Sequence, residues 1–118
     1  MQIHVHTDHN IDGHEALAHW ISGVVEQSLT GVSDRITRVE AHLRDENSDK
    51  KAGPNGMRCM LEAKLEGRPP LAVTDHADTI HNAVIAASGK LARLIDHTLD
   101  RAADKTKGRG KKLPLDAE

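Results

Sequence analysis

The residues of this chain with the most chemical potential are its nine histidines. His4 and His6 alternate with the apolar residues Ile3 and Val5. They therefore share one face of a predicted strand, and His9 follows closely. Two imidazoles on one face could bind a divalent metal. The same pattern is also typical of exposed histidines that bind nothing. His4 and His6 are thus weak metal candidates, and both interpretations stay open.

Residues suited to catalysis form no familiar arrangement. The single cysteine, Cys59, lies on the apolar face of a predicted strand, where a thiol is inert rather than activated. One cysteine also excludes an internal disulfide and a multi-cysteine zinc site. Asp12 and Glu15 have the spacing of a helix capping box. With no glycine-rich phosphate loop and no catalytic triad spacing, the sequence predicts a protein that is not an enzyme, with no cofactor and no small-molecule substrate.

Basic residues give a stronger pattern. Lys90, Arg93, His97 and Arg101 recur at helical spacing, about a quarter turn from the apolar stripe of the same predicted helix. Such a line could follow the phosphates of a nucleic acid. A solvated helix face, with cations favoured by the macrodipole near the helix C-terminus, would look the same.

Net charge divides the chain into two parts. Residues 1–100 carry a net charge of −5, and residues 101–118 carry +3. The segment 105–112, KTKGRGKK, has neither an apolar nor an acidic residue, which predicts a disordered basic tail. Its basic residues are candidates for contacting phosphates: Lys105, Lys107, Arg109, Lys111 and Lys112.

Composition excludes several classes of protein. Trp20 is the only aromatic residue besides the histidines, so the chain cannot be a module that stacks bases on several exposed aromatic rings. The longest apolar run, residues 83–87, is far short of the roughly 20 residues that span a bilayer. We therefore expect no membrane partner. The N-terminus has no pattern of a secretory signal, so we expect a cytoplasmic protein.

Apolar periodicity predicts six elements. Alternation indicates strands near residues 2–6, 36–43, 57–66 and 71–74, and helical spacing indicates helices near 13–29 and from about 79 to 103. Gly31 suits a left-handed C-terminal cap of the first helix, and Asp75 or Asp78 suits an N-cap of the second. Residues 44–56 have the composition of a hairpin loop.

This order, β-α-β-β-β-α, predicts an α+β fold. Each helix has one apolar stripe and the sheet has one apolar face. The simplest packing is a two-layer sandwich, in which two helices cover one face of a four-stranded sheet and the other face stays open. The first two strands are joined through a helix and can pair in parallel. Residues 1–104 would form one domain, followed by the tail 105–118.

Three short motifs resemble a known family. The sequence begins MQI, has DRI at residues 34–36 and has KLAR at residues 90–93. With the element order, these resemble the ribosome hibernation-promoting factor and ribosome-associated inhibitor family over residues 1–104. The resemblance implies the fold above, no catalysis, and binding to rRNA of the small ribosomal subunit in the channel of messenger and transfer RNA.

The resemblance carries individual residues over. Lys90 and Arg93 match the stretch in which family members contact RNA. Arg35 matches the DRI motif, and Arg101 lies on the same helix but outside a motif. The first helix departs from the family, because residues 12–34 contain no lysine or arginine.

These observations lead to one functional expectation and one alternative. The chain is expected to be a short, divergent hibernation-type factor that binds the small ribosomal subunit and sterically blocks translation. Alternatively, it is a non-enzymatic protein-interaction module that kept the fold and lost the ribosome. Histidine is the side chain whose charge responds most readily to mild acidification, so acidification is expected to make the acidic body more positive and favour RNA.

Overall fold

The computed structural model of the protein describes residues 1–8, 11, 13–46 and 56–107. For residues 102–107 it describes the backbone alone. The elements are β1 (Gln2–Thr7), α1 (His14–Ser28), a short 3-10 helix η1 (Thr30–Arg35), β2 (Ile36–Asp45), β3 (Met57–Leu65), β4 (Leu71–Ala77) and α2 (Ile80–Lys107). The predicted α+β class and the order β-α-β-β-β-α are therefore confirmed.

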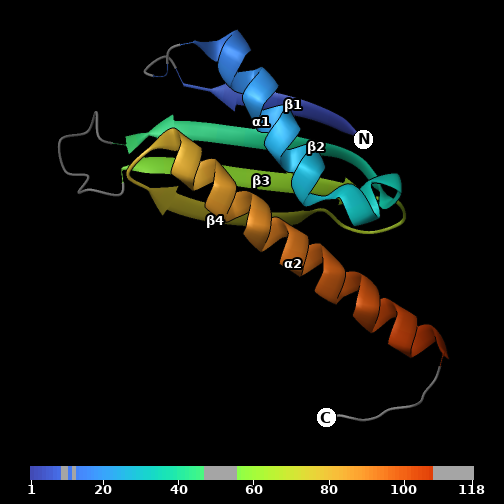
Figure 1. The fold of residues 1–118 in the computed structure, drawn as a ribbon. Coiled ribbons are helices and arrows are strands. Elements are labelled where there is room, and N and C mark those ends of the chain that lie inside the picture. The colour runs from blue at the N-terminus through green and yellow to red at the C-terminus, as the bar shows by residue number, and fades with distance from the viewer. Residues whose placement is uncertain (9–10, 12, 47–55, 108–118) are drawn as a thin grey trace.

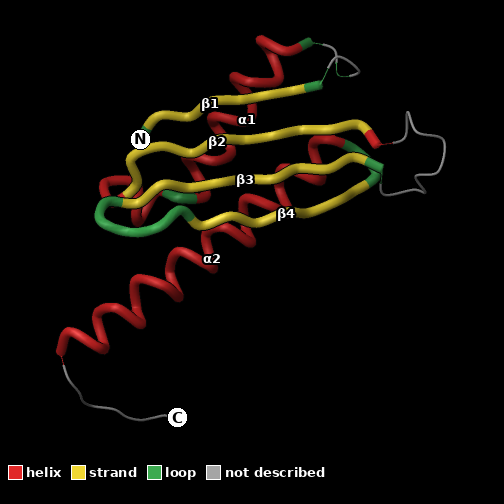
Figure 2. The backbone as a smooth tube through the Cα atoms, turned by 180° about the vertical axis from the view of Figure 1, so that it is seen from behind, coloured by secondary structure: helices red, strands yellow, loops and turns green. Residues whose placement is uncertain are grey.

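The four strands form one mixed sheet in the order β1-β2-β3-β4. The β1 strand pairs with β2 in parallel, and the two remaining pairs are antiparallel. Both helices lie on one face of this sheet (Figure 1). Seen from behind, the strands lie in front of the helices, and no described element covers this face of the sheet (Figure 2). The predicted two-layer arrangement with one open face is thus confirmed.

The core lies between the sheet and the two helices. On β3 the fully buried residues are Cys59, Leu61, Ala63 and Leu65, which alternate with half-buried neighbours that are charged except for Met60. They pack against buried positions of α1 and α2. The core members on the helices are Ile21, Val25, Ala83, Val84, Ala87, Leu91 and Ile95. This aliphatic layer is what fixes the helices on the sheet.

The predicted helix caps are wrong in detail. Gly13, at φ 69°, is the N-cap residue of α1, with no side-chain cap. It takes the place predicted for Asp12, which lies outside the described residues. Gly31 lies inside η1 without a positive φ, because the chain turns directly from α1 into that 3-10 helix instead of through a left-handed residue.

The start of α2 also differs from the sequence prediction. The Thr79 hydroxyl oxygen accepts a hydrogen bond from the backbone N–H of Asn82 at 3.1 Å, so Thr79 is the cap. Asp78 instead accepts from the side-chain amide of Asn82. Asp75 belongs to β4, which continues to Ala77 rather than ending at Thr74.

The α2 helix is longer than predicted. Its backbone continues to Lys107, whereas the sequence predicts an end near Ala103. Among its residues with described side chains, the last that is fully buried is Ile95, and the C-terminal part extends past the sheet (Figure 1). Lys105 and Lys107 therefore belong to the helix backbone, while Arg109, Lys111 and Lys112 lie outside the described residues. None of the helices in the described part of the chain could cross a membrane.

Candidate functional site

The basic line predicted on the second helix is present on α2. Lys90, Arg93, His97 and Arg101 are all exposed, and helical geometry places them within about a quarter of a turn around the axis. Leu91 and Ile95, on the buried side, are fully enclosed. The line therefore runs along the outer flank of a helix whose position is fixed by its apolar side.

Lys90 contacts two residues of β4 through its ammonium group. Its Nζ donates a hydrogen bond to the carbonyl oxygen of Thr74 at 3.0 Å and lies 3.6 Å from Oδ2 of Asp75. The Lys90 side chain is still 48% exposed. This residue thus anchors α2 to β4, and its charge is already partly balanced by a carboxylate.

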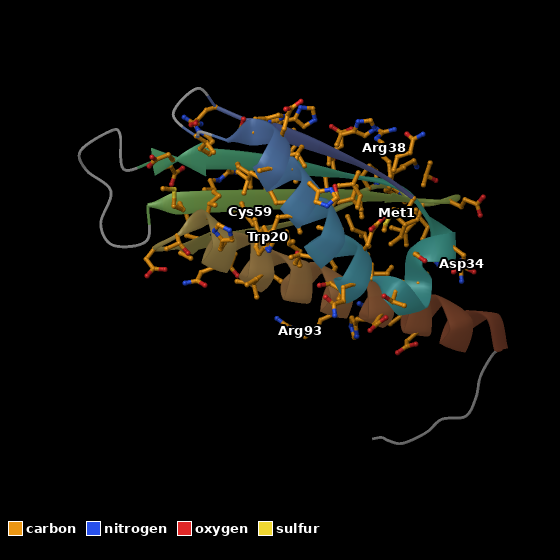
Figure 3. The ribbon with its side chains drawn as sticks, turned by 45° about the horizontal axis from the view of Figure 1, so that its top comes forward. Met1, Trp20, Asp34, Arg38, Cys59 and Arg93 are labelled. Atoms are coloured by element: carbon orange, nitrogen blue, oxygen red, sulfur yellow. The ribbon has the colours of Figure 1, made fainter. Side chains whose placement is uncertain are left out.

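Arg93 and Arg101 differ from Lys90 in this respect. Neither forms an ion pair or a side-chain hydrogen bond in the part of the chain that the structure describes. Asp96 and Asp100 are on the same helix, but neither comes within ion-pair distance of these arginines. Figure 3 shows Arg93 on the outer side of α2, pointing away from the strands. Two guanidinium groups are therefore available to an anionic partner.

The remaining predicted residues are less concentrated. Arg35 is exposed at the end of η1, directly before β2, and its carbonyl oxygen accepts the N–H of Glu66. Arg35 also has no ion-pair partner among the described residues. It belongs to a different element from the line on α2.

The open face has a second basic group, which the sequence pattern alone does not identify. In the sheet register, Arg44 of β2 lies opposite Arg58 of β3, and Arg58 lies opposite His76 of β4. Glu46 Oε1 lies 3.3 Å from Nε2 of His76. The alternation of each strand identifies its exposed residues, but only the register shows which charges are neighbours.

The predicted metal candidates separate in the structure. His4 Nε2 lies 3.5 Å from the side-chain oxygen of Gln2, and His4 belongs to no cluster of three possible ligands among the described residues. His6 instead lies beside His42 and Glu40 of β2. Arg38 donates a hydrogen bond to Glu40 and, together with His6, holds the pKa of that carboxyl below its ordinary value, while desolvation opposes them. Glu40 and His42 were missed because the sequence does not reveal strand pairing.

Cys59 is buried as predicted. Desolvation is the main cause that raises the pKa of its thiol to about 12, and the nearby carboxylate of Asp75 adds to the effect. A thiol of this kind stays neutral and is a poor nucleophile at physiological pH.

Two solved structures share this fold. One is described as a ribosomal subunit interface protein from Coxiella burnetii, with a TM-score of 0.62, 16% identity, and coverage of 85% of this chain and 99% of the other. The second is the N-terminal domain of Thermus thermophilus Protein Y, with a TM-score of 0.57, 17% identity, and coverage of 83% and 99%. No protein-family model and no curated protein matches the sequence. The likeness therefore shows the fold alone.

Proposed function

We propose that this protein is a ribosome-associated factor of the hibernation type, which binds rRNA of the small subunit and blocks translation without chemistry. The observation that carries the proposal is the fold match to a protein described as a ribosomal subunit interface protein, over nearly its whole length. The resemblance of the MQI, DRI and KLAR motifs points to the same family. A cytoplasmic location follows from this partner.

The basic flank of α2 is the proposed contact with RNA. Arg93 and Arg101 have no internal partner among the described residues, so binding to phosphate breaks no internal ion pair. Arginine also binds phosphate through two parallel hydrogen bonds. Lys90, Arg35 and the basic residues Lys105, Lys107, Arg109, Lys111 and Lys112 would add further phosphate contacts.

The proposed mechanism is steric. The folded body would occupy the channel of messenger and transfer RNA, with α2 along the rRNA and residues 105–118 extending the basic contact. The body is acidic, so orientation matters: the proposal has the basic flank of α2 face the phosphates. The lack of basic residues in α1 is consistent with one binding helix rather than two.

Co-sedimentation with purified ribosomes across a salt series is the direct test. We expect the wild-type protein to co-migrate with the small subunit at low salt and to be lost as salt rises, because phosphate contacts release counterions. Arg93→Glu with Arg101→Glu should weaken binding and reduce the slope of log affinity against log salt by about 2, one per lost phosphate contact. Removal of residues 105–118 should reduce the slope further.

The choice of variants follows from the internal contacts. Lys90→Glu would also remove the hydrogen bond to Thr74 and the ion pair with Asp75, so its effect on folding and on binding would be mixed. Arg44→Glu is the matched control for Arg93→Glu alone, because it makes the same change in charge on the opposite face of the sheet. If Arg44→Glu weakens binding as much as the change on α2, the assignment of the interface to α2 is wrong.

The alternative function has its own outcome in this test. Absence of co-sedimentation at low salt, at both pH 6 and pH 7.5, would favour the protein-interaction module over the ribosome factor. Stronger binding at pH 6 than at pH 7.5 would support the expectation that histidine protonation favours RNA. Equal affinities at the two values would contradict that expectation.

A further inference from the structure

Three possible metal ligands meet on the open face of the sheet. His6 of β1 and His42 of β2 are direct partners in the parallel register. Glu40 precedes His42 by two residues and therefore lies on the same face of β2. The ligand atoms of these three side chains all lie within 4.8 Å of one another. A cross-strand pair and a neighbour on the same face thus form one cluster.

The distances within the cluster are close to those of coordination. Glu40 Oε1 lies 3.1 Å from Nε2 of His6 and 3.9 Å from Nε2 of His42. In a tetrahedral zinc site, with bonds of 2.0–2.2 Å, two ligand atoms are about 3.3 Å apart. One carboxylate oxygen is therefore already placed between two imidazole nitrogens at nearly the required separation.

The rings need a modest rearrangement to bind an ion. The two imidazoles are stacked, with centroids 4.7 Å apart and an angle of 13° between their planes. Stacked rings direct their nitrogen lone pairs almost in parallel, so the nitrogens must turn towards a common point. Both side chains are partly exposed, 52% for His6 and 35% for His42, and this turn requires no repacking of the core.

Arg38 orients the carboxylate. Its Nε donates a hydrogen bond to Oε2 of Glu40 at 2.9 Å, which leaves Oε1 directed towards the histidines. Such an outer partner fixes the orientation of a ligating group in known metal sites. The neighbouring open depression, about 380 Å³ and lined in part by His6, His42 and Arg58, gives a water molecule access to a fourth position.

We propose that His6, His42 and Glu40 bind one divalent transition-metal ion, with Zn²⁺ as the representative, on the open face of the sheet. Two imidazoles and one carboxylate suit zinc and its neighbours in the first transition series rather than Mg²⁺, which prefers oxygen ligands and octahedral geometry. The bound ion would join the edge strand β1 to β2. This inference does not depend on ribosome binding.

Calorimetric titration with ZnCl₂ of the full chain, prepared without a histidine tag, tests the proposal. We expect a site that binds one equivalent in the wild type. His6→Ala, His42→Ala and Glu40→Gln should each weaken it at least tenfold. Binding of one equivalent that is unchanged in all three variants, or no binding up to 100 µM free metal, would overturn the proposal.

The chain offers two matched controls. The Nε2 atom of His76 lies 3.3 Å from Oε1 of Glu46 on the same face. Among the described residues, these two belong to no cluster of three possible ligands. His76→Ala and His4→Ala should therefore leave the site intact. A loss in either control equal to that in His42→Ala would place the ion elsewhere and contradict the assignment.

Two further readouts separate binding from folding. The melting temperature of the wild type should rise with Zn²⁺ and not with Mg²⁺, because the ion binds the folded state. The ring signals of His6 and His42 in long-range ¹H–¹⁵N spectra should move together with one equivalent of Zn²⁺. If only the signals of other histidines move, the proposed ligand set is wrong.

Discussion

The two faces of the sheet are built from alternate residues of the same strands, yet they differ in every physical respect. The covered face is aliphatic, with Val39, Ala41 and Leu61 fully buried. The open face has no fully buried side chain on β2 or β3, and its residues are mostly histidine, arginine and glutamate. One face stabilises the fold, and the other is available for binding.

The difference also concerns which information determines each face. On the covered face, any aliphatic side chain of suitable size can fill the layer. On the open face, the identity of each neighbour matters, because His6 can share a metal ion with His42 but could not share one with a glycine. The comparison teaches that the core depends on local pattern, whereas the chemistry depends on strand register.

The covered face should have its largest measurable effect on the reactivity of Cys59, which it buries. Its pKa of about 12 leaves about 1,000-fold less thiolate at pH 8 than a thiol with the ordinary value of 9.0 would have. Burial blocks access as well. We therefore expect alkylation by iodoacetamide at pH 8 to be at least 1,000-fold slower in the native protein than in urea.

The same group gives a prediction for pH. Because folding raises the pKa of the Cys59 thiol, the unfolded state loses its proton first, and the folded state loses stability as pH rises from about 9 towards 12. Cys59→Ala should remove this part of the alkaline loss. Rapid native alkylation with a single kinetic phase would show that the covered face opens far more readily than its packing indicates.

Truncation of a core residue should have the next largest effect. Leu61 is fully buried on β3, where it lies opposite Ala41 and Val73 in the register. Leu61→Ala should reduce the free energy of unfolding in urea by about 2–5 kcal/mol, through lost burial and the cavity that remains. The neighbouring Met60 is on the open face, and Met60→Ala should cost about 1 kcal/mol or less. Similar costs for the two would remove the distinction between the faces.

How much could be predicted from sequence follows the same division. Alternation at Cys59, Leu61, Ala63 and Leu65 located β3 and its buried face, since a period of two needs only neighbouring residues. The apolar stripe of α2 could be predicted equally well, because helical spacing also involves only nearby residues. The cluster of His6, His42 and Glu40 was not, because residues 34 or more positions apart become neighbours only after β1 pairs in parallel with β2.

The helix ends show a second limit. Asp12, Asp75 and Asp78 are of a residue type that favours the N-cap position. A cap must also directly precede the first turn of the helix. Asp75 is used by β4, whose length depends on pairing with β3, so the function of cap falls to Thr79. Sequence patterns thus located the helices and missed the residues at their ends.

A substitution at Thr79 tests the junction between the end of β4 and the start of α2. Thr79→Ala removes the acceptor of the Asn82 N–H and should reduce the free energy of unfolding by about 1 kcal/mol. Asp78→Ala, which loses only an exposed contact between side chains, should cost less. Urea denaturation of both variants distinguishes them, and a larger cost for Asp78→Ala would restore the cap expected from sequence.

The smallest effect concerns the open face, where like charges are neighbours. Arg44 and Arg58 are directly opposite in the antiparallel register, an arrangement that destabilises a sheet by about 0.2–1 kcal/mol. Arg44→Thr should therefore increase the free energy of unfolding slightly. The gain should shrink as salt rises from 10 mM to 0.5 M, because screening weakens the repulsion that the substitution removes.

Arg38→Thr, on the same strand, removes a cation that also lies opposite a like charge, Lys64, but that has an ion-pair partner. Arg38 forms an ion pair with Glu40 at 2.9 Å, so its loss should leave stability unchanged or slightly reduced, by at most about 1 kcal/mol. If Arg44→Thr also reduced stability, the row of Arg44 and Arg58 would be part of the stabilising structure. A gain would instead show that the open face keeps a repulsion between Arg44 and Arg58 that the fold does not need.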